Sequence, residues 1–254
     1  MSLFSGKTVI VTGAGLGIGR ATAVGFAADG ANVLGIGRTR ADLVETRRLC
    51  PAGSMDFVVG DVSRPENIAQ LLAKAKQLHG GADILVNNAA LYPKTGFLES
   101  TDEEWTRVIQ TNVVGMALCC RAFLPGMLER GFGRIINIGT LAWLGPIPNS
   151  SAYSASKGAV RPLTRAIACE IDRFRHPDVL VNELLPGVAR TRMSDHGEDP
   201  AAIYAHVRFV ASLPRNGPTG RTFMQSALYV EDYRLRSRLR RLLSRLTGGL
   251  VSAE

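Results

Sequence analysis

The chain has 254 residues, of which 46% are apolar and 20% are charged, a composition typical of a globular protein with a sizeable core. The formal net charge is +8, and the segment 231–254 supplies +3 of it, so the remaining positive charge is spread out and argues against a nucleic-acid groove. No apolar run reaches the roughly 18 residues of a membrane-spanning helix, so we expect no integral membrane segment.

The N-terminus and the cysteines indicate the cellular compartment of the protein. The chain enters a strand-like run at Thr8 almost at once, and we therefore expect no signal peptide. The cysteines form no Cys-x-x-Cys pair and are interpreted as reduced core residues of a cytoplasmic protein: Cys50, Cys119, Cys120 and Cys169. The histidines lack the spacing of metal ligands, so we predict no metal site.

Short apolar runs alternate with helical patterns along the chain. The strand-like runs are Thr8–Val11, Asn32–Ile36, Met55–Val59, Asp83–Val86, Arg134–Ile138, Val179–Glu183 and Arg221–Gln225. The helical patterns cover 17–29, 40–49, 65–78, 102–130, 151–175 and 200–212. This alternation predicts one α/β domain over residues 1–228: a doubly wound, seven-stranded parallel sheet with helices on both faces. Its ligand site should lie at the carboxyl ends of the strands.

A glycine-rich loop, Thr-Gly-Ala-Gly-Leu-Gly-Ile-Gly, occupies residues 12–19 between the first strand and the first helix. Glycines permit a tight turn, and the N-terminus of the following helix offers free N–H groups to a pyrophosphate. The spacing differs from the Gly-x-Gly-x-x-Gly of standard dinucleotide folds, so a plain structural turn is the alternative. We predict that a nucleotide lies against Gly13, Gly15, Leu16, Gly17, Ile18 and Gly19.

The end of the second strand bears on the choice of nucleotide. An acidic residue there binds a ribose 2′-OH, whereas an arginine accommodates a 2′-phosphate. This strand ends in Gly35-Ile-Gly-Arg38, which favours NADP(H) and leaves NAD(H) possible. Arg20 and Arg40 are candidate helpers, and a solvated arginine is the alternative for Arg38.

Polar residues also follow the third and fourth strands. Asp61, followed by Val62, is a candidate acceptor for the adenine amino group, or it caps the helix that begins near Pro65. The stretch Asn87-Asn-Ala-Ala90 brings Asn88 and Ala89 against the adenine ribose, or it only stabilises a turn.

Tyr153 and Lys157 are four residues apart, which is one helical turn, so both side chains share a helix face. An ammonium group beside a phenol favours the phenolate and lowers its pKa. The pair is therefore a candidate acid/base. By itself this spacing also occurs by chance on solvated helices, so its meaning depends on the motifs upstream.

Taken in order, these motifs resemble the classical branch of the short-chain dehydrogenase/reductase family over roughly residues 5–228. The residues that carry the resemblance are 12–19, Asp61, Asn-Asn-Ala at 87–89, Asn112, Tyr153, Lys157, and Pro186-Gly187 with Thr191. The resemblance implies a single Rossmann-like domain that forms a homotetramer or homodimer. It also implies an NAD(P)-dependent enzyme that reduces a carbonyl or oxidises an alcohol.

The same resemblance implies individual roles. Tyr153 would donate or accept the substrate proton, and Lys157 would lower the Tyr153 pKa and hold the nicotinamide ribose. Asn112 would hold a water in a proton relay, and its alternative is a local backbone bond within a helix. Thr191, with Pro186, Gly187 and Val188, would hold the nicotinamide, whereas an ordinary helix N-cap is the alternative for Thr191.

Two positions depart from the family pattern. Thr140 stands where the family normally has a serine, thirteen residues before the tyrosine. Its hydroxyl can polarise a carbonyl oxygen, and its methyl group makes the site more crowded. Pro162 lies within the helical pattern that follows Tyr153, where it should remove a bond to Gly158 and kink the helix.

Apolar residues between and around the catalytic hydroxyls suggest a hydrophobic ketone or alcohol as substrate. We predict a pocket lined by Leu91, Trp143, Leu144, Ile147 and Met193. Core or interface packing is an equal alternative for these side chains.

The last segment, 229–254, has leucines at helical spacing over Tyr233–Leu246 with arginines between them. We expect this basic amphipathic helix to pack on its own or a neighbouring subunit, with contact to anionic lipid or an acidic carrier protein as the alternative. The sequence thus predicts an NADP(H)-preferring enzyme that interconverts a hydrophobic ketone and a secondary alcohol. The alternatives are a 3-oxoacyl-thioester reductase of fatty-acid or polyketide metabolism and a catalytically silent, nucleotide-binding regulator.

Overall fold

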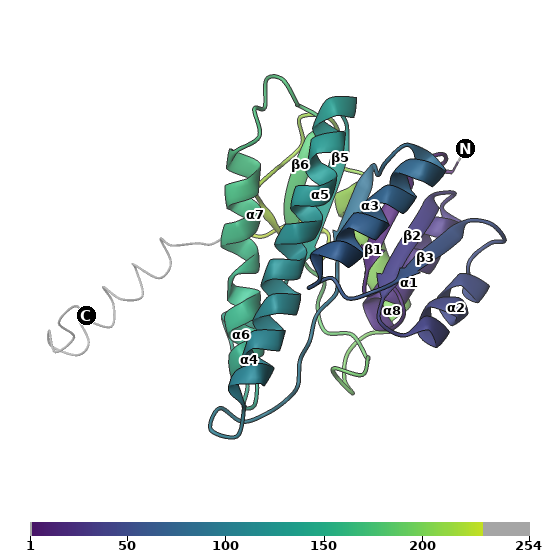
Figure 1. Ribbon diagram of the computed structural model, residues 1–254. Helices are drawn as coiled ribbons and strands as arrows, with labels where there is room; N and C mark the ends of the chain where they lie inside the picture. The colour runs from purple at the N-terminus through teal and green to yellow at the C-terminus, as the bar shows by residue number, and fades with distance from the viewer. Residues whose placement is uncertain (1, 231–254) are drawn as a thin grey trace, which may run out of the picture.

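In the computed structural model, which describes residues 2–230, the strands form one sheet in the order β3-β2-β1-β4-β5-β6-β7-β8 (Figure 1). The bounds are β1 Thr8–Thr12, β2 Asn32–Gly37, β3 Met55–Val59, β4 Ile84–Asn87, β5 Gly133–Ile138, β6 Val179–Leu185, β7 Thr222–Met224 and β8 Ala227–Leu228. The predicted parallel sheet is confirmed, because β1 to β7 all pair in parallel. The count of seven is corrected by β8, which pairs antiparallel with β7 and is too short to leave a strand pattern in the sequence.

Helices cover both faces of the sheet. They are α1 Gly17–Ala28, α2 Arg40–Leu49, α3 Pro65–His79, α4 Asp102–Ile109, α5 Gly115–Arg130, α6 Ser151–Gly158, α7 Val160–Cys169 and α8 Pro200–Ala211. Buried side chains of α1, α2 and α8 share one core with the sheet, and those of α3, α5 and α7 share the other. The strand order reverses between β1 and β4, and in doubly wound sheets ligands bind in the crevice at this reversal.

The helical pattern over 102–130 is interrupted by a π-helical turn, Gln110–Val114, which separates α4 from α5. The whole stretch Asp102–Arg130 is long and apolar enough to cross a membrane, but 44% of its most apolar window is buried inside the protein. Together with its packing against α3 and β5, this identifies it as a core helix of the domain. Single π turns inside helices are frequent at functional sites, and this one carries Asn112.

The pattern over 151–175 also divides, into α6 and α7 on either side of Ala159. Pro162 is the third residue of α7 and has no N–H to bond back to Gly158, and the helix divides one turn earlier at Ala159, whereas the predicted kink stays a prediction. The second helix ends at Cys169, earlier than the pattern suggested. Cys169 is exposed, which corrects its prediction as a core residue, whereas the other three cysteines are buried. The expected helix at Tyr233–Leu246 lies outside the described residues.

Candidate active site

The glycine loop joins β1 to α1 at the carboxyl edge of the sheet. Gly13 and Gly17 have φ angles of +67° and +52°, which side chains disfavour. A Cβ on Gly19 would collide with the carbonyl oxygen of Gly13, and one on Gly17 would lie 2.9 Å from the methyl group of Thr191. The loop therefore has no room for side chains at Gly17 and Gly19. The free N–H groups at the N-terminus of α1 lie at the end of this loop, which is the geometry of an anion-binding turn.

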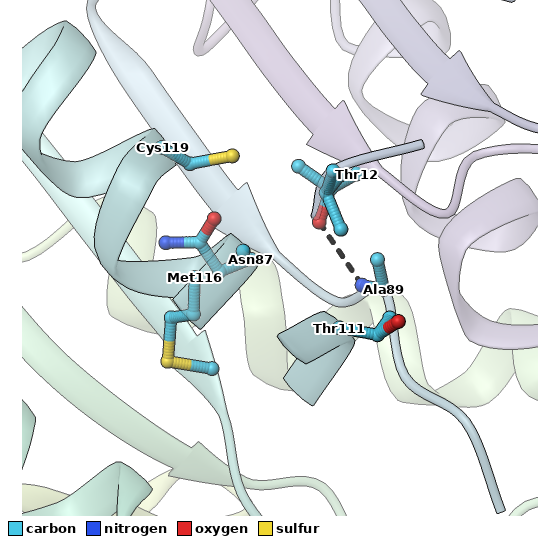
Figure 2. Close-up of a pocket in the computed structure, with 8 residues that line it drawn as sticks. Thr12, Asn87, Ala89, Thr111, Met116 and Cys119 are labelled. Carbon is cyan, nitrogen blue, oxygen red and sulfur yellow. Dashed lines mark hydrogen bonds between the residues drawn. The ribbon is translucent and has the colours of Figure 1, made fainter. Parts of the chain in front are cut away.

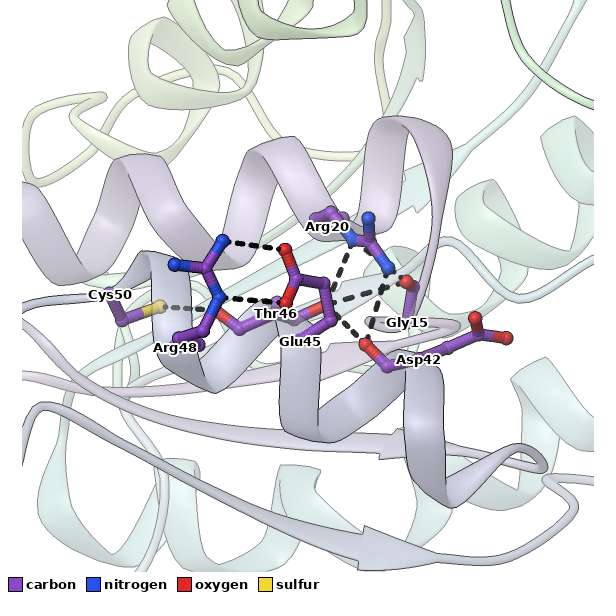
Figure 3. A network of polar contacts seen from close by, with 7 residues as sticks. All are labelled: Gly15, Arg20, Asp42, Glu45, Thr46, Arg48 and Cys50. Carbon is purple, nitrogen blue, oxygen red and sulfur yellow. Dashed lines mark hydrogen bonds and ion pairs between the residues drawn. The ribbon is translucent and has the colours of Figure 1, made fainter.

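Arg20 holds this loop against α2 (Figure 3). Its Nε donates to the Gly15 carbonyl at 2.9 Å and to the Thr46 hydroxyl at 3.1 Å, and a terminal nitrogen donates to the Asp42 carbonyl at 3.3 Å. These bonds occupy Nε and one terminal nitrogen of Arg20, and its suggested help in holding a 2′-phosphate stays a prediction. The sequence could not show these bonds, since α2 meets the loop only in the folded chain.

Arg38 and Asp61 lie at the ends of β2 and β3. Arg38 is exposed directly after β2, as is Arg40 at the start of α2, so both guanidinium groups are accessible to a ligand. Asp61 is half-buried, and its Oδ1 accepts hydrogen bonds from the Ser63 N–H at 2.9 Å and the Ser63 hydroxyl at 2.8 Å. The carboxylate therefore forms a turn before α3, whose N-cap is Arg64, and Val62 is buried beneath it.

Asn88 and Ala89 tie the end of β4 to the glycine loop. The backbone N–H groups of both donate to the Thr12 hydroxyl, at 2.9 and 3.0 Å, and Asn88 Nδ2 donates to the Thr12 carbonyl at 3.0 Å. Figure 2 shows the Thr12–Ala89 bond at the rim of a narrow pocket behind this junction. The pocket is lined by Thr12, Val62, Asn87, Ala89, Thr111, Gly115, Met116 and Cys119. None of the four catalytic candidates lines it, so we interpret it as a packing gap and not as the substrate site.

Tyr153 and Thr140 meet at the carboxyl edge of the sheet, one from α6 and the other from the end of β5. Burial raises the pKa of Tyr153 to about 12; the neighbouring Tyr92 adds to the rise, and a hydrogen bond with the Thr140 side chain opposes it. The Tyr92 ring stacks on the Tyr153 ring with centroids 4.6 Å apart. The phenol is therefore held protonated, in contact with a second hydroxyl.

Lys157 lies one turn further along α6 and is buried, with 2% of its surface exposed. Its Nζ donates to the Ile138 carbonyl at 2.7 Å and lies 6.0 Å from the centre of the Tyr153 ring. Burial lowers the pKa of Lys157 to about 8, and the Glu183 carboxylate opposes that change. The expectation that Lys157 lowers the Tyr153 pKa is wrong: the pKa is raised, because desolvation of the phenolate dominates and Tyr92 adds to it, and the opposing effect comes from Thr140.

Asn112 is fully buried on the π turn and bonds to two other segments. Its Nδ2 donates to the Leu91 carbonyl at 3.0 Å and to the Ser156 hydroxyl at 2.9 Å, while its Oδ1 accepts from the Leu91 N–H at 2.7 Å. The Ser156 hydroxyl donates in turn to the Tyr153 carbonyl at 2.7 Å. Asn112 therefore anchors the Tyr153 helix and the Leu91 loop, and the alternative of a local helix bond does not describe it.

The segment after β6 folds over the glycine loop. Gly187 has a φ angle of +90° after the buried Pro186, and Val188 is exposed. The Thr191 hydroxyl accepts from the Met193 N–H at 3.1 Å, so Thr191 forms a turn and is not the N-cap of α8, which is Asp199. Since Thr191 also touches Gly17, this segment and the loop form two sides of one site.

The apolar residues predicted to line the substrate pocket divide into two groups. Leu144 and Ile147 are 43% and 59% exposed, and Leu91 and Met193 are half-buried near Asn112 and Thr191. Trp143 instead lies beneath the Arg161 guanidinium at 5.6 Å, against the start of α7. Leu144 and Ile147 are thus exposed apolar side chains on the segment after Thr140, whereas Trp143 packs against α6 and α7.

Sequence reasoning missed Ser156 and Glu183 and assigned no specific role to Tyr92. A charged residue inside a buried, mainly apolar strand was the signal available for Glu183. The stacking of Tyr92 and the bond from Ser156 left no pattern, because both depend on packing between distant segments.

The fold and the site together define an oxidoreductase of the Rossmann type, with a nucleotide-binding glycine loop beside a hydroxyl–phenol–ammonium cluster. A family model described as short chain dehydrogenase matches residues 7–201. The chain belongs to the short-chain dehydrogenase/reductase family, and the resemblance seen in the sequence is confirmed.

Named relatives agree with this membership. The chain is 34% identical to an uncharacterised oxidoreductase of Thermotoga maritima, over 83% of this chain and 88% of that protein. It is also 34% identical to a glucose 1-dehydrogenase of Gluconobacter oxydans, over 80% of this chain and 79% of that one. A solved short-chain dehydrogenase/reductase, named as a glucose/ribitol dehydrogenase of Brucella melitensis, is similar with a TM-score of 0.80 and 27% identity, over 90% and 98% of the two chains.

Proposed function

We propose that the chain is an NADP(H)-preferring oxidoreductase that interconverts a hydrophobic ketone and a secondary alcohol by hydride transfer, with Tyr153 as proton donor and acceptor. The observation that carries this proposal is the contact between Thr140 and Tyr153 next to the buried Lys157. Two hydroxyl groups that meet at the edge of a nucleotide-binding sheet can hold one carbonyl oxygen between them.

The residues present fit a nicotinamide dinucleotide. The tight loop at Gly13–Gly19 leaves the N-terminus of α1 for a pyrophosphate, and Arg38 is exposed where a 2′-phosphate would lie. Thr191 and Gly187 would hold the nicotinamide end, and Asp61 and Asn88 the adenosine end. When bound, the reduced cofactor supplies the hydride.

The protein's own groups handle the proton and the orientation of the substrate. A phenol whose pKa is about 12 is protonated at neutral pH, so Tyr153 begins the reduction as a proton donor to the carbonyl oxygen. Thr140 donates a second hydrogen bond that fixes this oxygen. Lys157 stabilises the phenolate that remains, and Asn112 and Ser156 hold the Tyr153 helix in place.

Exposed apolar side chains on the segments that follow Thr140 and Gly187 support a hydrophobic substrate. Leu144, Ile147 and Val188 present surfaces that a sugar would not cover favourably. In the same proposal the enzyme is cytoplasmic and assembles as a homodimer or homotetramer.

A substrate screen tests the proposal directly. Purified protein is assayed for oxidation of NADPH and NADH with aryl, alicyclic and 3-oxoacyl-thioester carbonyls, and for reduction of NADP⁺ and NAD⁺ with glucose and ribitol. We expect turnover with a hydrophobic ketone and a higher kcat/KM for NADPH than for NADH. Turnover of sugars alone would refute the substrate class. Tight NADPH binding without turnover of any compound would refute the enzyme and support a silent regulator.

A further inference from the structure

Four polar side chains lie next to one another across β4, β5, β6 and β7. The strand register pairs Asn87 with Asn137, Asn137 with Glu183, and Glu183 with Thr222. All four are buried, at 4% exposure or less. Neighbours at one register point to the same face of a parallel sheet, and Asn137 donates to Thr164 of α7 at 2.9 Å. The row therefore lies on the face covered by α7, the helix that follows the one carrying Tyr153 and Lys157, and Glu183 is its ionisable member.

The Glu183 carboxylate is only partly satisfied. Its Oε2 accepts a hydrogen bond from the Thr222 hydroxyl at 2.7 Å, whereas Oε1 is buried without a hydrogen-bond partner among residues 2–230. A Cβ on Gly139 would collide with Oε1, so this oxygen lies directly against Gly139. Burying a carboxylate costs free energy unless an opposite charge or a full set of hydrogen-bond donors compensates. The unpartnered Oε1 of Glu183 therefore calls for a nearby positive charge.

The nearby positive charge is the Lys157 ammonium, which lies at the end of β5. Lys157 Nζ donates to the carbonyl of Ile138, the residue before Gly139, and Thr140 follows Gly139. The ammonium and the carboxylate thus approach the same short stretch of backbone. The charged groups that face Glu183 are Lys157 of α6 and Arg161 of α7, while β5 and β7 contribute the uncharged Asn137, Gly139 and Thr222.

We propose that Glu183 is a positioning residue for Lys157, because its buried carboxylate keeps the lysine in the ammonium form beside Tyr153 at the end of β5. Burial lowers the pKa of Lys157 to about 8 and raises that of Glu183, and each group opposes the effect of burial on the other. Without the carboxylate, a larger fraction of Lys157 would be neutral at physiological pH. The electrostatic coupling between Glu183 and Lys157 requires only the folded chain, without cofactor or substrate. Its consequence for catalysis rests on the proposed function.

The coupling is measured through stability, which needs no substrate. Unfolding free energies of the full chain are determined from pH 6 to 10 for wild type and Glu183→Gln, each with and without Lys157→Met. The amide keeps the shape of the side chain and an acceptor for Thr222. For wild type and for Glu183→Gln, the unfolding free energy is compared with that of the same protein carrying Lys157→Met. This difference in free energy begins to change at the pH where Lys157 of the folded protein loses its proton, which we call the onset. We expect this onset near pH 8 in wild type and about one pH unit lower in Glu183→Gln.

Asp83→Asn is the matched control, since Asp83 accepts from the Thr8 N–H at 2.9 Å at the opposite edge of the sheet. It should leave the onset unchanged. Thr222→Val is a second test that keeps the carboxylate but removes its hydrogen bond, and we expect a smaller shift in the same direction. An onset that stays at the wild-type pH in both Glu183→Gln and Thr222→Val would overturn the coupling.

Kinetics separate this inference from the function itself. The pH at which kcat/KM for NADPH-dependent reduction declines on the alkaline side should move down with the stability onset in Glu183→Gln. If the onset moves and the kinetic profile does not, the Glu183–Lys157 coupling stands and the catalytic role proposed for Lys157 is refuted.

Discussion

Burial of Lys157 predicts a dependence of stability on pH that can be calculated from the structure. The pKa of a free lysine is 10.5, and burial lowers that of Lys157 to about 8. Between these two pH values the unfolded chain binds a proton that the folded chain does not. The wild-type protein should therefore gain stability relative to Lys157→Met as the pH rises through this window, and lose that gain as the pH falls through about 8.

The size of the gain follows from the two pKa values. At about 1.36 kcal/mol for each pH unit between 10.5 and about 8, the complete effect is roughly 3 kcal/mol, and most of it should appear by pH 10. Below about pH 7, where the folded lysine is fully protonated, the difference between the two proteins should be constant. The raised pKa of Tyr153 acts in the opposite direction at higher pH, but it is common to both proteins and cancels in the difference.

Urea unfolding followed by tryptophan fluorescence, at fixed protein concentration from pH 7 to 10, measures this difference. Methionine replaces the lysine with an unbranched apolar side chain that suits the buried position. Lys76→Met, at an exposed position of α3, is the control for the exchange of a lysine for a methionine. A flat difference for Lys157→Met would refute the reasoning, since it would mean that burial does not disfavour this charge.

Three further predictions concern catalysis and the cofactor. Tyr153→Phe should lower kcat by at least about a hundredfold while NADPH binding, followed by fluorescence, changes little; retained turnover would refute its acid/base role. Thr140→Ser should keep activity and Thr140→Val should lose most of it, and equal rates for both would show that the hydroxyl is not needed. Arg38→Asp should lower the ratio of kcat/KM for NADPH to that for NADH by at least about tenfold, from loss of one charged contact. Arg48→Asp, at a position paired with Glu45 on α2, is its control, and an unchanged ratio in Arg38→Asp would place the phosphate contact elsewhere.

The elements predicted from the sequence agree with the structure where a local pattern carried the information. The strand runs and the glycine loop lie where the sequence placed them, and Pro162 makes no bond to Gly158 because a missing N–H is a property of the residue itself. The π turn at Asn112 and the short strand β8 were not predicted. The π turn is held by contacts with distant segments, through the bonds of Asn112 to Leu91 and Ser156, whereas β8 is a two-residue strand that pairs with the adjacent β7 and is too short to leave a pattern.

Interactions between side chains were predicted less well than their positions. The bonds by which Arg20 holds the glycine loop to α2 were not predicted, and the pKa of Tyr153 is raised by burial and Tyr92, whereas Lys157 was expected to lower it. Side-chain bonds and pKa values depend on which side chains are desolvated on folding. Desolvation is determined by packing between segments far apart in the chain.

The sequence by itself determined the class of fold, the nucleotide loop and the identity of the hydroxyl, phenol and lysine, because these depend on residue type and local spacing. Only the tertiary structure decided that Glu183 lies under the end of β5 with Lys157. Four strands from different parts of the chain must pair in one register before Asn87, Asn137, Glu183 and Thr222 become neighbours. Strand register is a long-range property, so the electrostatic environment that Glu183 provides for Lys157 exists only in the folded sheet.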